Sequence, residues 1–93
     1  MTETEDDLAI RRKKLLYRSQ YTGTKETDIV LSRFATAHLQ DFGSDKLDLY
    51  EQMLDAGDPE ILAWVTRRKA VPAAYDNAVT RMLMEFEFFQ PGD

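Results

Sequence analysis

The chain has 93 residues, a formal net charge of −5 and no cysteine. This length permits one small domain, which buries roughly 60–65% of the surface of its unfolded chain. The absence of cysteine excludes disulfides and thiolate metal sites.

The acidic residues 1–6 predict a disordered tail, followed by one helical domain over residues 7–90. A first helix is predicted over residues 7–20, where apolar residues recur at helical spacing and neither Gly nor Pro intervenes. The break at residues 22–24 ends it, and a second helix is predicted over residues 25–39. Carboxylates fall in the first turn of that second helix, where they offset the exposed N–H groups of a helix start.

The next helix break is predicted at Phe42-Gly43-Ser44. Ser44 is expected to cap a third helix that ends at Gly57. A fourth helix is predicted to open with Asp58 as its cap and Pro59 at its first position. It is expected to end in three cations, which suit a helix C-terminus: Arg67, Arg68 and Lys69.

Pro72 is expected to start the last helix, which ends at Pro91-Gly92. Five apolar residues form a core stripe on it: Tyr75, Val79, Met82, Leu83 and Phe86. With short connections, no repeat and no low-complexity stretch, the predicted fold is all-α, a compact five-helix bundle in a single domain.

Charge is unevenly spread along the chain. Residues 11–25 hold six basic side chains and no acidic one, whereas residues 26–93 hold 13 acidic and six basic side chains. A basic patch on an acidic body suits nucleic acid or an acidic protein surface, and it also suits a plain solvated helix face. The run RRKK, however, spreads around a helix, and the acidic remainder repels a phosphate backbone. A small nucleic-acid-binding or regulatory protein that uses residues 11–25 is therefore the alternative function, and we do not expect a nucleic-acid partner.

A catalytic function is not expected. His38 is the only histidine and lies mid-helix beside Phe34, so it is expected in the core or at its boundary rather than as a base. No nucleophile–base pair is available, and the carboxylates between residues 41 and 55 do not match a calcium loop. The glycines stand singly, so no phosphate cradle is visible and no stably bound cofactor is expected.

The aromatic residues leave two alternatives open. Trp64 is expected to pack in the core, with an interface anchor as the other interpretation. Phe86, Phe88 and Phe89 cannot all face one core, because positions two apart lie about 200° apart around a helix. Either that helix frays or one of these side chains is exposed in a docking patch.

Two stretches together carry a family resemblance. They are KKLLYRSQYTGTKETDIVLSRFA, residues 13–35, with an RGxxE-type motif, and GDPEILAWV, residues 57–65, with the pattern DPxxxxW. In order, spacing and helical layout the chain resembles the succinate dehydrogenase assembly factors that promote FAD attachment, the SdhE family. The likeness covers roughly residues 8–86.

The resemblance implies a five-helix bundle that binds the flavoprotein subunit of succinate dehydrogenase, and in bacteria also that of fumarate reductase. It implies assistance in the covalent linkage of FAD to a histidine of that subunit, without a lasting place in the finished complex. The flavin chemistry would belong to the partner and its FAD, so this chain itself is not expected to be an enzyme.

The motif's glycine matches Gly23 and its glutamate matches Glu26, with the basic residue that often precedes it at Lys25. Thr22 stands where the family has an arginine, so a contact that needs a guanidinium is not carried over. A glycine between two helices would let a partner's backbone approach without a Cβ in the way. The candidate partner-binding residues are Arg18, Thr22, Gly23, Lys25, Glu26 and Asp28.

The cellular location is also predicted from the sequence. No apolar run approaches the ~20 residues of a membrane span, so membrane insertion is not expected. The N-terminus lacks a signal-peptide pattern and is too acidic for a mitochondrial presequence. The chain is therefore expected in the bacterial cytoplasm.

Overall fold

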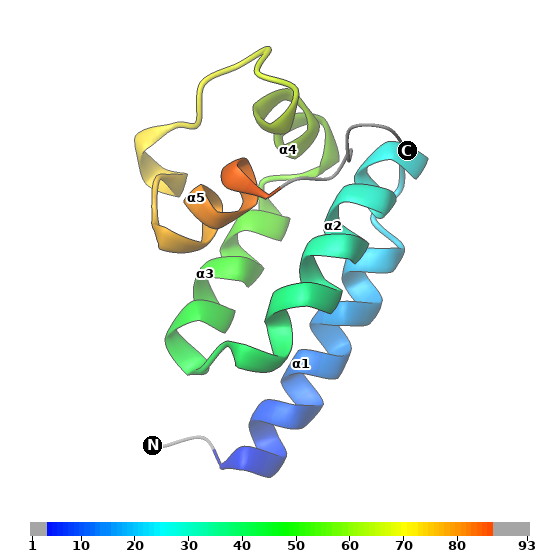
Figure 1. The fold of residues 1–93 in the computed structure, drawn as a ribbon, viewed down its shortest axis with the longest axis vertical. Coiled ribbons are helices and arrows are strands. Elements are labelled where there is room, and N and C mark those ends of the chain that lie inside the picture. Colours follow the sequence, from blue (N-terminus) through cyan, green and yellow to red (C-terminus); the bar gives the residue numbers. More distant parts are fainter. Residues whose placement is uncertain (1–3, 87–93) are drawn as a thin grey trace.

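Helices form the whole framework of the computed structural model, which describes residues 4–86 (Figure 1). The α-helices are α1 (Glu5–Gln20), α2 (Lys25–His38), α3 (Ser44–Asp55), α4 (Asp58–Val65) and α5 (Ala78–Glu85). Two 3₁₀ turns join them, η1 (Leu39–Asp41) and η2 (Ala73–Tyr75). No strand occurs among residues 4–86. The predicted all-α, five-helix, single-domain fold is therefore confirmed.

The two longest helices, α1 and α2, pack side by side along the molecule, and α3 contacts α1 (Figure 1). The chain turns between α2 and α3 at one end of these helices and between α3 and α4 at the other. The short helices α4 and α5 contact each other, with α4 also against α2 and α5 against α3. The α1–α2 connection and the start of α4 consequently lie at the same end of the bundle.

The first helix begins earlier than its apolar pattern predicts. Thr4 caps it with a reciprocal pair of bonds: the Asp7 backbone N–H donates to the Thr4 hydroxyl at 3.1 Å, and the Thr4 N–H donates to the Asp7 carboxylate at 3.3 Å. This capping box fixes the helix start at Glu5. Residues 4–6 thus form the start of α1 rather than part of a tail, and residues 1–3 lie outside the described part.

The core centres on aromatic side chains from several helices. The Phe34 ring of α2 stacks on Tyr50 of α3 with centroids 5.8 Å apart, and it meets Phe42 and Phe86 edge-on. His38 lies half-buried with its ring 4.9 Å from that of Phe34, the boundary position that its neighbours predict. Of the other C-terminal aromatics, Phe88 and Phe89 lie outside the described residues.

Trp64 is fully buried, with 0% of its surface exposed, and its ring lies 5.3 Å from that of Tyr75. Its burial decides between the two interpretations of this residue in favour of packing. The indole N–H has no hydrogen-bond partner among the described residues, so the contribution of Trp64 comes from its apolar contacts.

A buried polar pair joins α1 to α3. The Ser19 hydroxyl donates to the Leu15 carbonyl at 2.7 Å, so the Tyr50 hydroxyl is left to donate to Ser19 Oγ, 2.5 Å away. Burial raises the pKa of Tyr50 to about 12, because a phenolate would be poorly solvated at this position.

The segment between α4 and α5 differs most from the prediction. α4 ends at Val65, and Arg67 adopts a left-handed φ of 63° in the turn that follows. Pro72 is extended, with ψ of 152°, and is followed only by the 3₁₀ turn η2 rather than by an α-helix. The last helix begins only at Ala78, where the Asn77 side chain accepts from two backbone N–H groups at 3.0 Å. Asn77 supplies the cap that Pro72 cannot, because proline at a helix start still needs a capping oxygen before it.

We expect Trp64→Ala to lower the free energy of unfolding by roughly 3–5 kcal/mol, since the substitution leaves a large cavity in the core. Trp64→Phe keeps one aromatic ring and removes less buried volume than alanine does, together with an N–H that has no partner among the described residues, so its loss of stability should be clearly smaller. Chemical denaturation followed by circular dichroism measures both. A loss below about 1 kcal/mol for the alanine variant would contradict the packing role.

Tyr50 should make the fold sensitive to alkali. Its folded pKa of about 12 lies above the unfolded value of 10.0. The neutral hydroxyl therefore stabilises the fold fully below pH 10, and this contribution is lost as the pH rises through about 12. Urea unfolding across this window should show a steeper loss for the wild type than for Tyr50→Phe. Equal losses in the two proteins would contradict the assignment.

Candidate functional site

A surface cavity of about 590 Å³ opens where the α1–α2 connection faces the start of α4. Its lining comes from three segments: Arg18, Tyr21, Thr22, Gly23 and Thr24; Leu54 and Asp55; and Gly57, Asp58 and Pro59. The two stretches that carry the family resemblance, 34 residues apart at Thr24 and Asp58, therefore meet in space. This cavity is the candidate site.

One hydrogen bond closes the site. The Thr24 backbone N–H donates to Asp58 Oδ2 at 3.1 Å. Asp58 was expected to cap α4, but Gly57 occupies the capping position with a φ of 97°. The Asp58 carboxylate is thereby free to bind the α1–α2 connection instead of its own helix.

Gly23 is required by this arrangement for two reasons. Its φ of 124° lies in a region that residues with a Cβ rarely adopt. A Cβ built at this position would lie 2.9 Å from Asp58 Oδ2, closer than Cβ atoms come to other heavy atoms in folded proteins, so the Asp58 carboxylate would have to shift. The glycine thus lets the α1–α2 connection approach Asp58 of the same chain. The sequence predicted a different use of this glycine, namely the approach of a partner's backbone.

The other side of the connection is held by α2. Thr22 donates to Asp28 Oδ1 twice, from its backbone N–H and from its hydroxyl, both at 2.6 Å. These bonds lower the pKa of Asp28 below its ordinary value of 3.8, and the bond from the Thr22 hydroxyl has the largest effect. The Thr24 hydroxyl in turn accepts from the Thr27 N–H at 3.3 Å and caps α2. The connection is therefore held at both ends by its own hydrogen bonds.

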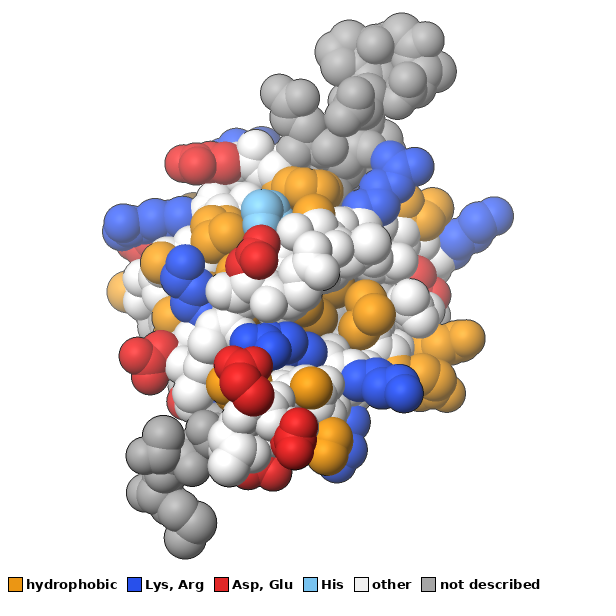
Figure 2. Space-filling view, turned by 60° about the horizontal axis from the view of Figure 1, so that its bottom comes forward, with side chains coloured by type: hydrophobic (Ala, Val, Ile, Leu, Met, Phe, Trp, Pro, Cys, Tyr) orange, Lys and Arg blue, Asp and Glu red, His pale blue; other side chains and the backbone are white. Residues whose placement is uncertain are grey.

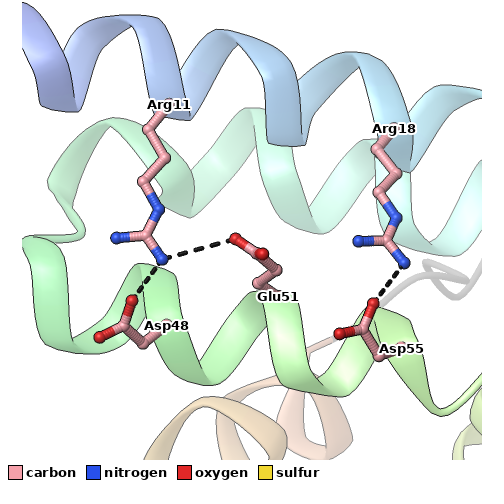
Figure 3. A network of polar contacts seen from close by, with 5 residues as sticks. All are labelled: Arg11, Arg18, Asp48, Glu51 and Asp55. Atoms are coloured by element: carbon pink, nitrogen blue, oxygen red, sulfur yellow. Dashed lines mark hydrogen bonds and ion pairs between the residues drawn. The ribbon is translucent and has the colours of Figure 1, made fainter.

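Ion pairs between α1 and α3 form the wall beside the cavity (Figure 3). Arg18 donates to Asp55 Oδ1 at 2.7 Å, and Arg11, two turns earlier on α1, binds Asp48 and Glu51. Both residues of the Arg18–Asp55 pair line the cavity. Exposed pairs of this kind contribute about 0–1 kcal/mol each, so their main effect is to orient the side chains.

The structure brings together only some of the candidate residues. Arg18, Thr22 and Gly23 line the cavity, and Asp28 lies behind Thr22. Lys25 and Glu26 are exposed in the first turn of α2 and do not line it. Glu26 makes no hydrogen bond or ion pair to another described residue, so its carboxylate is available at the surface.

Sequence reasoning missed four polar or aromatic contributors to the cavity: Tyr21, Thr24, Asp55 and Asp58. The only signal for Asp58 was its place in the second stretch of the resemblance, because the local pattern indicated a helix cap. Nothing local indicated Asp55, since its part in the site depends on how α1 packs against α3.

Two further observations concern metal binding and membrane spanning. Among residues 4–86, no group of three or more His, Cys, Asp or Glu side chains is placed to hold a metal ion. No helix in the same part of the chain has the length and apolar character that crossing a bilayer requires.

The fold and the cavity define a small all-helical domain with a fixed polar connection at its surface. The chain belongs to the family described as "Flavinator of succinate dehydrogenase", whose model matches residues 13–87. The resemblance of the two stretches to the succinate dehydrogenase assembly factors is thereby confirmed. It is a family of assembly factors rather than of catalytic enzymes.

Individual relatives agree with this assignment. The chain is 36% identical over 83 residues to the protein named succinate dehydrogenase assembly factor 2-B, mitochondrial, of Drosophila willistoni, covering 87% of this chain and 53% of that protein. It is 34% identical over 83 residues to succinate dehydrogenase assembly factor 2, mitochondrial, of Drosophila virilis, covering 87% and 52%. The chain thus spans about half the length of the curated relatives it matches.

The expected bacterial cytoplasmic location is wrong, because these relatives are mitochondrial proteins by name. That expectation depended on the character of the N-terminus. A chain that spans about half of its relatives does not allow a conclusion from where it begins.

The Thr22–Asp28 contact can be tested by titration. Because Asp28 has a lowered pKa in the fold, its contribution to stability is present above the unfolded value of 3.8 and is lost as the pH falls through the lower folded value. Thr22→Val removes the hydroxyl donor and keeps the backbone N–H. We expect the Asp28 pKa to rise toward 3.8, measured by NMR titration of its carboxyl carbon. Thr36→Val, at an exposed position of α2, is the matched control. An unchanged Asp28 pKa in Thr22→Val would contradict the assignment.

Proposed function

We propose that this chain binds the flavoprotein subunit of succinate dehydrogenase and promotes covalent attachment of FAD to a histidine of that subunit. The observation that carries the proposal is the meeting of the two resemblance stretches at one surface cavity, closed by the Thr24–Asp58 hydrogen bond. Membership of the flavinator family supports the same partner. The flavoprotein subunit of fumarate reductase is a second candidate partner, supported by the resemblance alone.

The mechanism we propose is stabilisation of one state of the partner. The domain would hold the loosely packed flavoprotein so that its histidine faces the flavin ring, which requires tighter binding to that state than to others. The chemistry of the linkage would come from the flavin and the histidine, with the protein supplying orientation and electrostatics. This domain itself would bind FAD only through its partner, not as a stable cofactor of its own.

Glu26 is the side chain best placed to contact the partner. It is exposed and has no hydrogen-bond or ion-pair partner among the described residues, and it lies in the first turn of α2, two residues after the N-cap Thr24. The Thr24 cap holds the start of α2, so the backbone at Glu26 is already ordered. Binding of a partner's cation to the Glu26 carboxylate would therefore cost little backbone entropy.

The arrangement of charges does not favour the nucleic-acid alternative. Arg11 and Arg18 are paired with carboxylates of α3, and Arg12 donates to the Phe42 carbonyl at 2.8 Å. On the face shown in Figure 2, acidic and basic side chains are interspersed rather than separated. A phosphate backbone would meet repulsion along with attraction on such a face.

Glu26→Ala should leave the fold nearly intact and sharply reduce covalent flavin on a co-expressed flavoprotein subunit. Loss of one half of a desolvated charge contact costs about 2–5 kcal/mol of affinity. The measurement is in-gel flavin fluorescence of the subunit, beside a thermal melt of each variant. Asp45→Ala is the matched control, because Asp45 is also an exposed first-turn carboxylate, on α3.

Normal flavin fluorescence with Glu26→Ala would remove this residue from the contact. Gly23→Val is a poor probe, because it would displace Asp58 and strain the connection before any partner is involved. Thr22→Arg restores the family's arginine opposite Asp28 and is expected to be neutral or mildly favourable for flavin attachment.

A further inference from the structure

The described residues expose four large hydrophobic side chains, and three of them lie on one line along α1 and its C-cap. Ile10 is 55% exposed, Tyr17 64% and Tyr21 67%. Positions 10, 14, 17 and 21 fall within about 60° of one another around a helix. The rings of Tyr17 and Tyr21 contact each other with centroids 4.6 Å apart. The outer face of α1 therefore carries an apolar line that the bundle does not cover.

Two lysines complete this surface. A shallow cavity of about 380 Å³ is lined by Ile10, Lys13, Lys14 and Tyr17. We name the five residues Ile10, Lys13, Lys14, Tyr17 and Tyr21 the α1 stripe. Lysine stems extend an apolar surface while their ammonium groups stay in water, so the stripe is apolar along its centre and positive at its edges.

The basic run is divided between two faces of α1. Arg11 and Arg18 bind carboxylates of α3, and Arg12 binds the Phe42 carbonyl. Lys13 and Lys14 make no ion pair with another described residue. The positive charge of α1 that is left for an outside partner therefore lies on the stripe, and it is complementary to an acidic surface.

The stripe is continuous with the candidate site. Tyr21 lies at its C-terminal end and also lines the cavity beside Gly23 and Asp58. A partner that contacts the cavity would reach the stripe without crossing a gap. Exposed aromatic side chains are the residue types that most often supply binding energy at protein interfaces.

We propose that the α1 stripe is a second part of the docking surface and receives an acidic segment of the flavoprotein subunit that carries apolar anchor residues. This proposal rests on the proposed function. The apolar anchors of that segment lie over Ile10 and Tyr17, and its carboxylates face Lys13 and Lys14. The cavity fixes the position of the partner, and the stripe adds affinity and speeds association through its charge.

The test uses the full chain and the purified flavoprotein subunit without FAD. The double variant Ile10→Ser with Tyr17→Ser should raise the Kd at least about tenfold, with a melting temperature close to that of the wild type because both side chains are exposed. Ile29→Ser is the matched control, since Ile29 is the fourth exposed hydrophobic residue and lies on α2. It should leave the Kd within about twofold.

A charge-reversed pair, Lys13→Glu with Lys14→Glu, tests the stripe without removing apolar area. It should slow association at low salt, and the difference from wild type should shrink as salt rises. Arg68→Glu, at an exposed position after α4, is its control.

Three outcomes would overturn the proposal. Wild-type affinity of both stripe variants, with affinity lost in Glu26→Ala, would exclude the stripe and leave the proposed function standing. No binding by the wild-type chain would remove the proposed function as well. A wild-type chain that sediments as a dimer, with stripe variants that are monomers, would show that a second copy occupies the stripe.

Discussion

The hydrogen bond between the Thr24 backbone N–H and the Asp58 carboxylate is the constraint on which the site geometry depends. It joins two segments that neighbour each other only because α1, α2 and α3 bring both to one end of the bundle. The conformation of Gly23 follows from it, since only a residue without a Cβ fits at 2.9 Å from that carboxylate. Hydrogen bonds of Thr22 and Thr24 to residues of α2 then restrict the backbone of the rest of the connection. A short loop becomes a surface of defined shape in this way.

Much of the fold could be predicted from local signals, and the failures have a common physical cause. The spacing of apolar residues predicted the helices, and the single glycines predicted the breaks between them. The expected roles of Asp58 and Pro72 were wrong because the same residue type serves more than one purpose. An aspartate before a proline can cap its own helix or bind a distant N–H group, and tertiary packing decides which. Asn77 was overlooked because Pro72 offered a start signal five residues earlier.

The site shows the same division between local and tertiary information. Gly23 and Glu26 came from the resemblance alone, because no physical property of the sequence marks them as more than a helix break and a first-turn charge. The run RRKK was expected to spread around a helix, but the sequence does not show which of its side chains bind within the fold. Adjacent positions on a helix point about 100° apart, so Arg11 and Arg12 bind within the fold while Lys13 and Lys14 remain outside.

The rigidity of the α1–α2 connection suggests how an assembly factor can act without remaining bound to its partner. In the proposed function, the chain must bind one state of its partner tightly and release the finished product, so the difference between two affinities matters more than either alone. A connection fixed by its own hydrogen bonds suits this requirement, because it cannot adapt to a changed partner surface. Under the proposed function, a flavoprotein that changed shape once its flavin was linked would lose a rigid contact at the cavity rather than remodel it. The proposed lysine contacts at the α1 stripe would not hold the complex alone, since exposed charge pairs contribute about 0–1 kcal/mol each.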